Sequence, residues 1–277
     1  MGGKYKLLPQ ILPLFPDKIS TFIDLFAGGC NVGINVSADK IICNDIIYYL
    51  IDLYDSLKTN DPENIIGYID RRISDLGLSS ANRDAFVKLR QEYNTTRHPL
   101  DFFILIAHSF NYQIRFNSRH EYNTPFGKDK SSFNNMMRTN LSRFIERIQS
   151  LDICFTSCDF IDFDLTGLTT EDFVYCDPPY LITNGAYNDG KRGFNGWDQS
   201  HEYRLLELLS DLDNLNIRFA LSNVITHKGK KNQILIDWIE HNNFHVEHLK
   251  KNYAASSYHT ADRSKNGSDE VLITNYL

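Results

Sequence analysis

The stretch Phe173-Val174-Tyr175-Cys176-Asp177-Pro178-Pro179-Tyr180 joins a short apolar run to an acid, two prolines and an aromatic ring. The apolar run predicts a buried strand. Because proline cannot continue a central strand ladder, the strand must end at Asp177 and the chain must turn outward. Ligands bind at the carboxyl ends of strands in open α/β sheets. The stretch therefore predicts a lip with an acceptor carboxylate, backbone carbonyls and a flat ring, suited to a planar heterocycle bearing an amino group.

A second motif indicates where another ligand could approach. Residues 21–26 predict an apolar strand, and Ala27-Gly28-Gly29 predicts the turn after it. Two glycines let the backbone approach a ligand closely, and a helix expected over 30–36 would present its amide end. The following glycine is Gly33, whereas a dinucleotide fingerprint requires G-x-G-x-x-G, so the spacing argues against a nicotinamide enzyme. Tight packing alone is the alternative role for this turn.

The second predicted strand, 40–43, ends at Asn44-Asp45. An acid at this position can accept hydrogen bonds from ribose hydroxyls. Asp45 could equally cap the helix that follows. From residue 53 the alternation of strands and helices gives way to a helical block that ends near residue 150, which indicates an insertion.

Periodicity predicts the remaining elements. The expected helices are 6–15, 62–76, 81–93, 99–113, 201–212, 230–241 and one that starts at Ser131 or Ser132 and runs to 148. The expected strands are 152–156, 218–221, 244–249 and 270–276, and a loop or hairpin is expected over 114–130.

Composition points to one large domain, or to one domain with an insertion: the chain has 277 residues, of which 42% are hydrophobic. No apolar stretch is long enough to span a membrane and the start lacks a signal pattern, so a cytoplasmic protein is expected. The five cysteines are scattered without zinc-finger spacing, which favours reduced thiols and no metal site.

The charge is unevenly distributed. Residues 85–150 hold 10 Lys and Arg against 5 Asp and Glu, which leaves −11 for the rest of a chain whose net charge is −6. A basic segment in an acidic protein is typical of one DNA-facing surface, although a solvated helical face would look the same.

On these residues the chain resembles the Dam-type amino-methyltransferases of the D12 class (alpha group), which modify adenine in DNA, and is most similar to the T-even phage Dam methylases. The similar motifs follow one another in the family's order: Gly2-Gly3-Lys4-Tyr5, Phe22-Ile23-Asp24-Leu25-Phe26-Ala27-Gly28-Gly29, Arg115-Phe116-Asn117, Glu121-Tyr122-Asn123-Thr124-Pro125-Phe126-Gly127, Asp177-Pro178-Pro179-Tyr180, Leu181-Ile182-Thr183, Leu221-Ser222-Asn223-Val224 and Asn266-Gly267-Ser268-Asp269-Glu270-Val271. The likeness covers nearly the whole chain.

The resemblance implies a class I methyltransferase fold of the α/β class: a Rossmann-like, mostly parallel sheet with helices on both faces and an inserted, mainly helical target-recognition domain. Residues 1–53 and 151–277 would form the catalytic domain, and 54–150 the DNA-binding insertion. Residues 181–197 would be a lid over the site.

The resemblance also implies S-adenosyl-L-methionine as the cofactor and no metal. The residues expected to bind the cofactor are Gly3, Lys4, Tyr5, Asp24, Phe26, Ala27, Gly28, Gly29, Asp45, Ile46, Asp159, Phe160, Asp177 and Tyr187. One departure from the family is the missing aromatic residue before the glycine pair, because Met1 stands there.

Catalysis is expected from Asp177, Pro178, Pro179 and Tyr180, which would bind an adenine flipped out of double-stranded DNA. The expected DNA contacts are Arg115, Phe116, Asn117, Arg119, Tyr122, Asn123, Pro125, Phe126, Lys128 and Arg138. The similarity over this segment suggests methylation of GATC. The protein is expected to be a monomer in solution that could form a dimer on DNA. The other hypotheses are the same chemistry on another DNA sequence or on RNA, and a non-catalytic nucleic-acid-binding module on this scaffold.

Overall fold

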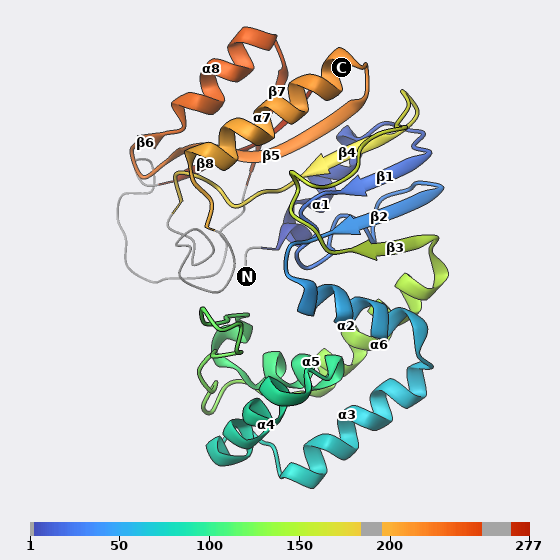
Figure 1. Ribbon diagram of the computed structural model, residues 1–277, viewed down its shortest axis with the longest axis vertical. Coiled ribbons are helices and arrows are strands. Elements are labelled where there is room, and N and C mark those ends of the chain that lie inside the picture. Colours follow the sequence, from blue (N-terminus) through green and yellow to red (C-terminus); the bar gives the residue numbers. More distant parts are fainter. Residues whose placement is uncertain (1–2, 184–195, 251–266) are drawn as a thin grey trace. The chain divides into compact units, whose positions relative to one another are not determined.

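The computed structural model describes residues 3–183, 196–250 and 267–277 (Figure 1). These residues divide into two compact units. Residues 47–157 form a mainly helical unit, and the described residues of 2–46, 158–190 and 196–277 form a unit built on a β-sheet. No helix in the described part of the chain combines the length and the apolar character needed to span a membrane.

The sheet of this unit is mostly parallel, and it is antiparallel at one edge. Its strands are β1 (Thr21–Asp24), β2 (Lys40–Asn44), β4 (Phe173–Cys176), β5 (Arg218–His227), β6 (Lys230–Lys231), β7 (His245–Leu249) and β8 (Ser268–Thr274). The order along the sheet is β2-β1-β4-β5-β8-β7, with β6 paired to β5. β2, β1, β4 and β5 are parallel, whereas β8 is antiparallel to both β5 and β7.

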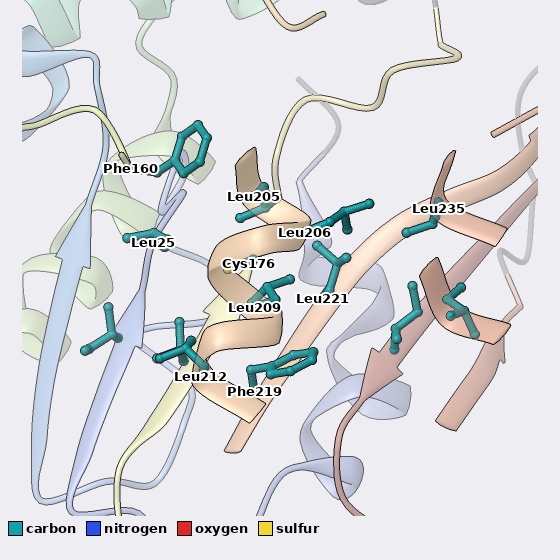
Figure 2. Packing of buried hydrophobic residues seen from close by; sticks show 14 of the residues in the cluster. Leu25, Phe160, Cys176, Leu205, Leu206, Leu209, Leu212, Phe219, Leu221 and Leu235 are labelled. Atoms are coloured by element: carbon teal, nitrogen blue, oxygen red, sulfur yellow. The ribbon is translucent and has the colours of Figure 1, made fainter. Parts of the chain in front are cut away.

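Strand alternation gives the two faces of this sheet different partners. On one face Val174 and Cys176 of β4 join the buried cluster formed with α7 (Gln199–Asn214) and α8 (Gln233–Asn242) (Figure 2). On the other face Phe173 and Tyr175 pack against Phe15, with ring centroids 4.8 and 5.5 Å apart. That face is covered by the N-terminal helical segment, η1 (Lys4–Leu7), α1 (Leu8–Ile11) and η2 (Leu12–Leu14). The expected α/β sheet with helices on both faces is therefore confirmed.

The helix expected over 30–36 is wrong, because the chain forms consecutive turns there. Gly28 and Cys30 both have left-handed backbone conformations, with φ of 47° and 54°, which a helix cannot contain. Gly33 has a packing role instead. A Cβ added to Gly33 would lie 2.5 Å from Cys43 Sγ, so only glycine allows this loop to lie against β2.

The helical unit consists of α2 (Tyr48–Thr59), α3 (Pro62–Leu76), α4 (Arg83–Thr96), α5 (Pro99–His108), η3 (Phe110–Tyr112), α6 (Asn135–Ser150) and β3 (Ile153–Thr156). The mostly buried helix α5 contacts α2, α3 and α4. Its buried Asp101 accepts from Arg72 Nε of α3 at 3.0 Å and from the Tyr68 hydroxyl at 3.0 Å. Helix α5 therefore lies at the centre of this unit, with most of its residues buried.

Two helix boundaries differ from expectation. The helix expected over 99–113 ends at His108, since the next residue, Ser109, is extended, with φ of −86° and ψ of 159°. The last helix of the unit starts at Asn135 instead of near Ser131, and its cap is Asn134, whose side chain accepts from Met137 N at 2.9 Å. The helix expected over 6–15 is divided into η1, α1 and η2, and the first two residues of the helix expected over 230–241 form β6 instead. The other expected helices and strands form, with ends shifted by a few residues, and β5 extends beyond the expected 218–221.

We predict that Gly33→Ala destabilises the sheet unit by about 1–3 kcal/mol, because its methyl group would overpack a buried site. The matched control is Gly29→Ala in the same loop, whose Cβ would meet only the flexible end of Asn31 at 2.9 Å. Urea unfolding of the two variants tests this. Equal midpoints for both would contradict the packing role of Gly33.

Candidate active site

The carboxylate of Asp177 stands directly after β4, where Pro178 and Pro179 end the strand. Phe173 and Tyr175 face the N-terminal segment, and alternation carries Asp177 to the same face. The Tyr175 hydroxyl there lies 2.9 Å from Ser222 Oγ of β5. The expected strand-to-proline switch thus delivers a carboxylate to the end of a central strand.

Lys4 of η1 reaches this carboxylate from the start of the chain. Its Nζ lies 2.6 Å from Asp177 Oδ1 and 3.0 Å from Glu270 Oε1 of β8, and it also donates to the Tyr180 hydroxyl. The hydroxyl of Tyr180 in turn lies 2.9 Å from Asp177 Oδ1 and 3.2 Å from Glu270 Oε1. We call Lys4, Asp177, Tyr180 and Glu270 the ion-pair cluster.

The charges in the ion-pair cluster are well defined. Burial alone would lower the pKa of Lys4, but the carboxylates of Asp177 and Glu270 raise it above its usual value. Burial, together with the same two carboxylates, raises the pKa of Tyr180 well above its usual value. Lys4 is therefore an ammonium and Tyr180 a neutral hydroxyl, so both act as hydrogen-bond donors to the carboxylates.

Asp24 is a second buried carboxyl group, at the end of β1 and 2% exposed. The backbone N–H groups of Phe26 and Gly33 donate to it, but its Oδ1 is buried without a hydrogen-bond partner among the described residues. Burial, followed by the charges of Asp177 and Asp45, raises the pKa of Asp24 to about 8. A buried acceptor that lacks a donor is a place for a ligand's donor group.

The glycine turn and the second strand end are joined by a hydrogen bond. The Gly28 N–H donates to Asp45 Oδ2 at 2.8 Å. Asp45 is not the cap of the following helix, because α2 begins after Ile47 and has no side-chain cap. The adjacent Ile46 is 37% exposed. The carboxyl groups of Asp24, Asp45 and Asp177 thus gather at the ends of three adjacent strands.

Comparison with known proteins identifies the family. Residues 1–255 match the D12 class of N6 adenine-specific DNA methyltransferases. The chain belongs to this family. Membership in it implies a methyl donor, and the resemblance seen in the sequence is confirmed at this level.

The relatives include enzymes of restriction-modification systems. Over 276 residues the chain is 50% identical to Modification methylase StsI of Streptococcus sanguinis and 49% identical to Type II methyltransferase M.FokI of Planomicrobium okeanokoites. Both matches cover 100% of this chain but 42% of the relative, so the chain spans less than half the length of these proteins. A DNA adenine methylase of Salmonella typhi is 28% identical over 80% of this chain and 78% of its own. The finer likeness to T-even phage methylases stays a prediction.

The other expected cofactor residues surround the glycine turn with varied exposure. Gly3 and Tyr5 are exposed, Tyr5 by 70%, and Ala27 is buried. The Phe26 ring lies 5.3 Å from that of Phe160, measured between centroids. Asp159 accepts from Ile161 N at 3.1 Å and so shapes its own turn. Tyr187, like most of the expected lid, lies outside the described residues.

Two residues near this site have no individual role in the sequence-based prediction, although Trp197 is the last residue of the expected lid. Glu270 lies in a similar motif, but nothing in the pattern indicates that it meets Lys4, which is far away in the chain. Trp197 packs against Phe26 and Phe160, with centroids 5.6 and 5.5 Å apart. Its indole N–H donates to the buried Glu202 at 2.7 Å. Tertiary contacts of this kind leave no local signal in the sequence.

The expected DNA-contact segment forms a hairpin in the helical unit, as Phe116 and Tyr122 pair in an isolated bridge. Both rings are buried, 2% and 1% exposed, so in this structure they do not form the open stacking surface expected for bases. Phe116 stacks on Tyr49, with centroids 4.4 Å apart, and Tyr122 contacts Phe102 at 5.9 Å. Their apolar rings are used to hold the hairpin on the helices.

The tip of this hairpin is set by Asn117. Its Oδ1 accepts from Arg119 N and Glu121 N, both at 2.9 Å, and its Nδ2 donates to Glu121 Oε2 at 2.7 Å. The side chain of Arg119 is 79% exposed and lies 3.1 Å from Glu121 Oε2. Asn117 therefore shapes the tip, and Arg119 projects from it.

The remaining expected contacts fall into two groups. The buried atoms Arg115 Nε and Asn123 Oδ1 lack hydrogen-bond partners among the described residues. Pro125 and Lys128 are exposed. In contrast, Phe126 packs on Phe86, and Arg138 forms an ion pair with Asp70 and lies over the Phe133 ring. In the first group the exposed side chain of Lys128 is open to solvent, whereas the side chains of the second group already have protein partners.

We predict that the stability of the ligand-free protein falls as the pH rises from about 4 to 8 through the titration of Asp24. An aspartate is ionised above about pH 4 when unfolded, whereas folded Asp24 stays protonated up to about pH 8. The contribution of Asp24 to the free energy of unfolding is therefore complete at low pH. It decreases toward pH 8 by up to about 1.4 kcal/mol per pH unit.

Urea unfolding of the wild type and Asp24→Asn at pH 5, 6, 7 and 8 provides the measurement, with the exposed Asp39→Asn as control. The free energy of unfolding of Asp24→Asn minus that of the wild type should increase at each step to higher pH. Parallel curves would contradict the raised pKa.

Proposed function

We propose that this chain transfers a methyl group from S-adenosyl-L-methionine to the 6-amino group of adenine in double-stranded DNA. Family membership supports the reaction type. The main structural support is the Asp177 carboxylate, which Lys4 and Tyr180 hold at the end of β4. The chain covers only 42% of the length of StsI and of M.FokI. We therefore base the proposed activity on the residues of this chain itself.

The residues around Asp24 fit the proposed cofactor. Its buried Oδ1, which has no donor among the described residues, suits the ammonium of the methionyl moiety. Asp45 follows the adjacent strand, where it suits the ribose hydroxyls. The close approach allowed by the glycine turn and the rings of Phe26 and Phe160 suit the rest of the molecule. When bound, the cofactor would supply an electrophilic methyl group.

The chemistry asks Asp177 to act as a hydrogen-bond acceptor. The amino group of adenine is a poor nucleophile, because its lone pair is delocalised into the ring. Asp177 and the Pro178 carbonyl would accept from its two hydrogens, which raises electron density on nitrogen and favours attack. The ring of Tyr180 would stack on the base. Alignment for in-line transfer supplies most of the remaining catalysis, and no strong base is required.

A base within a duplex cannot reach a strand end of the protein, so the adenine must be flipped out. We propose 54–150 as the target-recognition domain and the hairpin tip as its main contact. Arg115, Arg119, Asn123 and Pro125 would contact the grooves, with Lys128 on the phosphates. Phe116, Asn117 and Tyr122 would support the hairpin, and Phe126 and Arg138 would contribute only after leaving their present partners.

The recognition sequence has two candidates. Similarity of the Arg115 to Gly127 segment to the Dam type favours GATC. The higher identity to modification methylases, 50% against 28% for a DNA adenine methylase, favours another type II site. Tritiated methyl transfer to plasmid DNA, followed by mapping of the sequences protected from methylation-sensitive nucleases, distinguishes the two.

We predict that Asp177→Ala abolishes methyl transfer to plasmid DNA while the affinity for DNA changes by less than about threefold, since the carboxylate acts on the amino group and contacts no phosphate. Asp162→Ala, an exposed acid of the same unit, serves as the control. Transfer by Asp177→Ala would contradict the mechanism. DNA binding without transfer by the wild type would favour a non-catalytic binding module.

We predict that Lys128→Ala lowers the slope of log Kd against log salt concentration by about 0.9, the effect of losing one phosphate contact. Arg71→Ala, which removes an exposed charge from α3, is the control and should leave the slope unchanged. Fluorescence anisotropy with labelled duplex at several salt concentrations gives the slopes. An unchanged slope for Lys128→Ala would place the phosphates elsewhere.

A further inference from the structure

In the ligand-free protein one oxygen of the proposed acceptor, Oδ1 of Asp177, is already occupied. Asp177 Oδ1 accepts from Lys4 Nζ at 2.6 Å and from the Tyr180 hydroxyl at 2.9 Å. Hydrogen bonds that a carboxylate accepts from the protein reduce what it can offer to a substrate. Oδ1 must therefore loosen these contacts, at least in part, where it is the oxygen that accepts from the amino group of the target base.

Loosening these contacts would deprive the buried ammonium of Lys4 of one of its counter-ions. Its side chain is only 6% exposed. A buried ammonium that loses its counter-ion costs several kcal/mol. A second carboxylate must stay paired with Lys4 to keep the free-energy cost of the movement of Asp177 small.

Glu270 is in the position to be that carboxylate. Its Oε1 lies 3.0 Å from Lys4 Nζ and 3.2 Å from the Tyr180 hydroxyl, so both donors that hold Asp177 also reach Glu270 without moving. The hydroxyl has one hydrogen for the two carboxylates, and it can pass from one to the other by rotation about its C–O bond.

The strand pattern explains how Glu270 comes to this place. On β8, Val271 and Ile273 belong to the apolar cluster beneath α7 and α8, so Glu270 lies on the opposite face, where the N-terminal segment packs. Its side chain is 1% exposed. A charge buried this deeply is costly without partners, and its partners here are the donors of the proposed active site.

We propose that Glu270 is a positioning residue, which takes over Lys4 and the Tyr180 hydroxyl so that Asp177 can accept from the target amino group. This role rests on the proposed methyl transfer. It requires the negative charge of Glu270 more than its size, because a neutral acceptor would leave Lys4 bound to Asp177 alone.

The charge requirement separates this role from a structural one. Glu270→Gln keeps the size and removes the charge, whereas Glu270→Asp keeps the charge and shortens the side chain. If Glu270 acts through its charge, the kcat of Glu270→Asp exceeds that of Glu270→Gln. If Glu270 only fills space, the order is reversed.

The test measures kcat for methyl transfer to plasmid DNA, the Kd for S-adenosylhomocysteine and the Kd for duplex DNA. For Glu270→Gln we expect kcat to fall about 10- to 100-fold, the equivalent of losing a hydrogen bond between charged groups. Both Kd values should stay within about threefold of wild type. Glu247→Gln, an exposed glutamate on the neighbouring β7, is the control and should behave like wild type.

A third variant tests whether the Tyr180 hydrogen is the shared group. In the Tyr180→Phe background, the loss of kcat caused by Glu270→Gln should become smaller, because the hydroxyl no longer competes for Asp177. Wild-type kcat in Glu270→Gln, or a loss of ligand binding and thermal stability that parallels the loss of kcat, would overturn the role of Glu270. Absence of transfer by the wild type would instead overturn the proposed function.

Discussion

The sheet unit is organised around one buried cation. Lys4 enters from the first helical turn and is neutralised by carboxylates from two strands that are not neighbours, Asp177 after β4 and Glu270 on β8. Because a buried ammonium needs partners in fixed places, this contact ties the start of the chain to residues far along it. The same need holds Asp177 in position before any substrate is present, so a structural requirement and a chemical one coincide in one cluster.

The two faces of the sheet have different roles: one packs the apolar core, and the other carries the ion-pair cluster. Apolar residues of β4, β5 and β8 pack beneath α7 and α8 on one face, where the buried Glu202 accepts hydrogen bonds from Trp197, Asn223 and Asn232. On the other face the aromatic rings of Phe15, Phe173 and Tyr175 give way, toward the carboxyl ends of the strands, to the charged cluster. Alternation at period two thus lets one strand serve the core and the site together. A shift of one residue in β4 would exchange the two roles.

Sequence predicted most of the strands and helices, because their signals are local. Helix α3 has the expected bounds, since Asp61 caps it, Pro62 starts it and the left-handed Gly77 ends it. The loop over 30–36 could not be foreseen, because its course depends on Cys43 from another strand approaching Gly33. Asp177 was evident from the prolines beside it. Glu270 was not, because its importance arises from a contact with Lys4, 266 positions earlier, that no local pattern records.

The hairpin of the helical unit shows that residue type alone does not tell exposed side chains from buried ones. Aromatic, arginine and asparagine residues alternate there, as they do in surfaces that bind bases, yet Phe116 and Tyr122 are buried and Asn117 is used in shaping the turn. The hydrogen bonds of Asn117 and the stacking of Phe116 on Tyr49 hold the tip from which Arg119 projects. In this hairpin Arg119 at the tip is exposed, while the rings of Phe116 and Tyr122 that hold it are buried. Substitutions at the tip can therefore change what the hairpin presents without altering the packing beneath it.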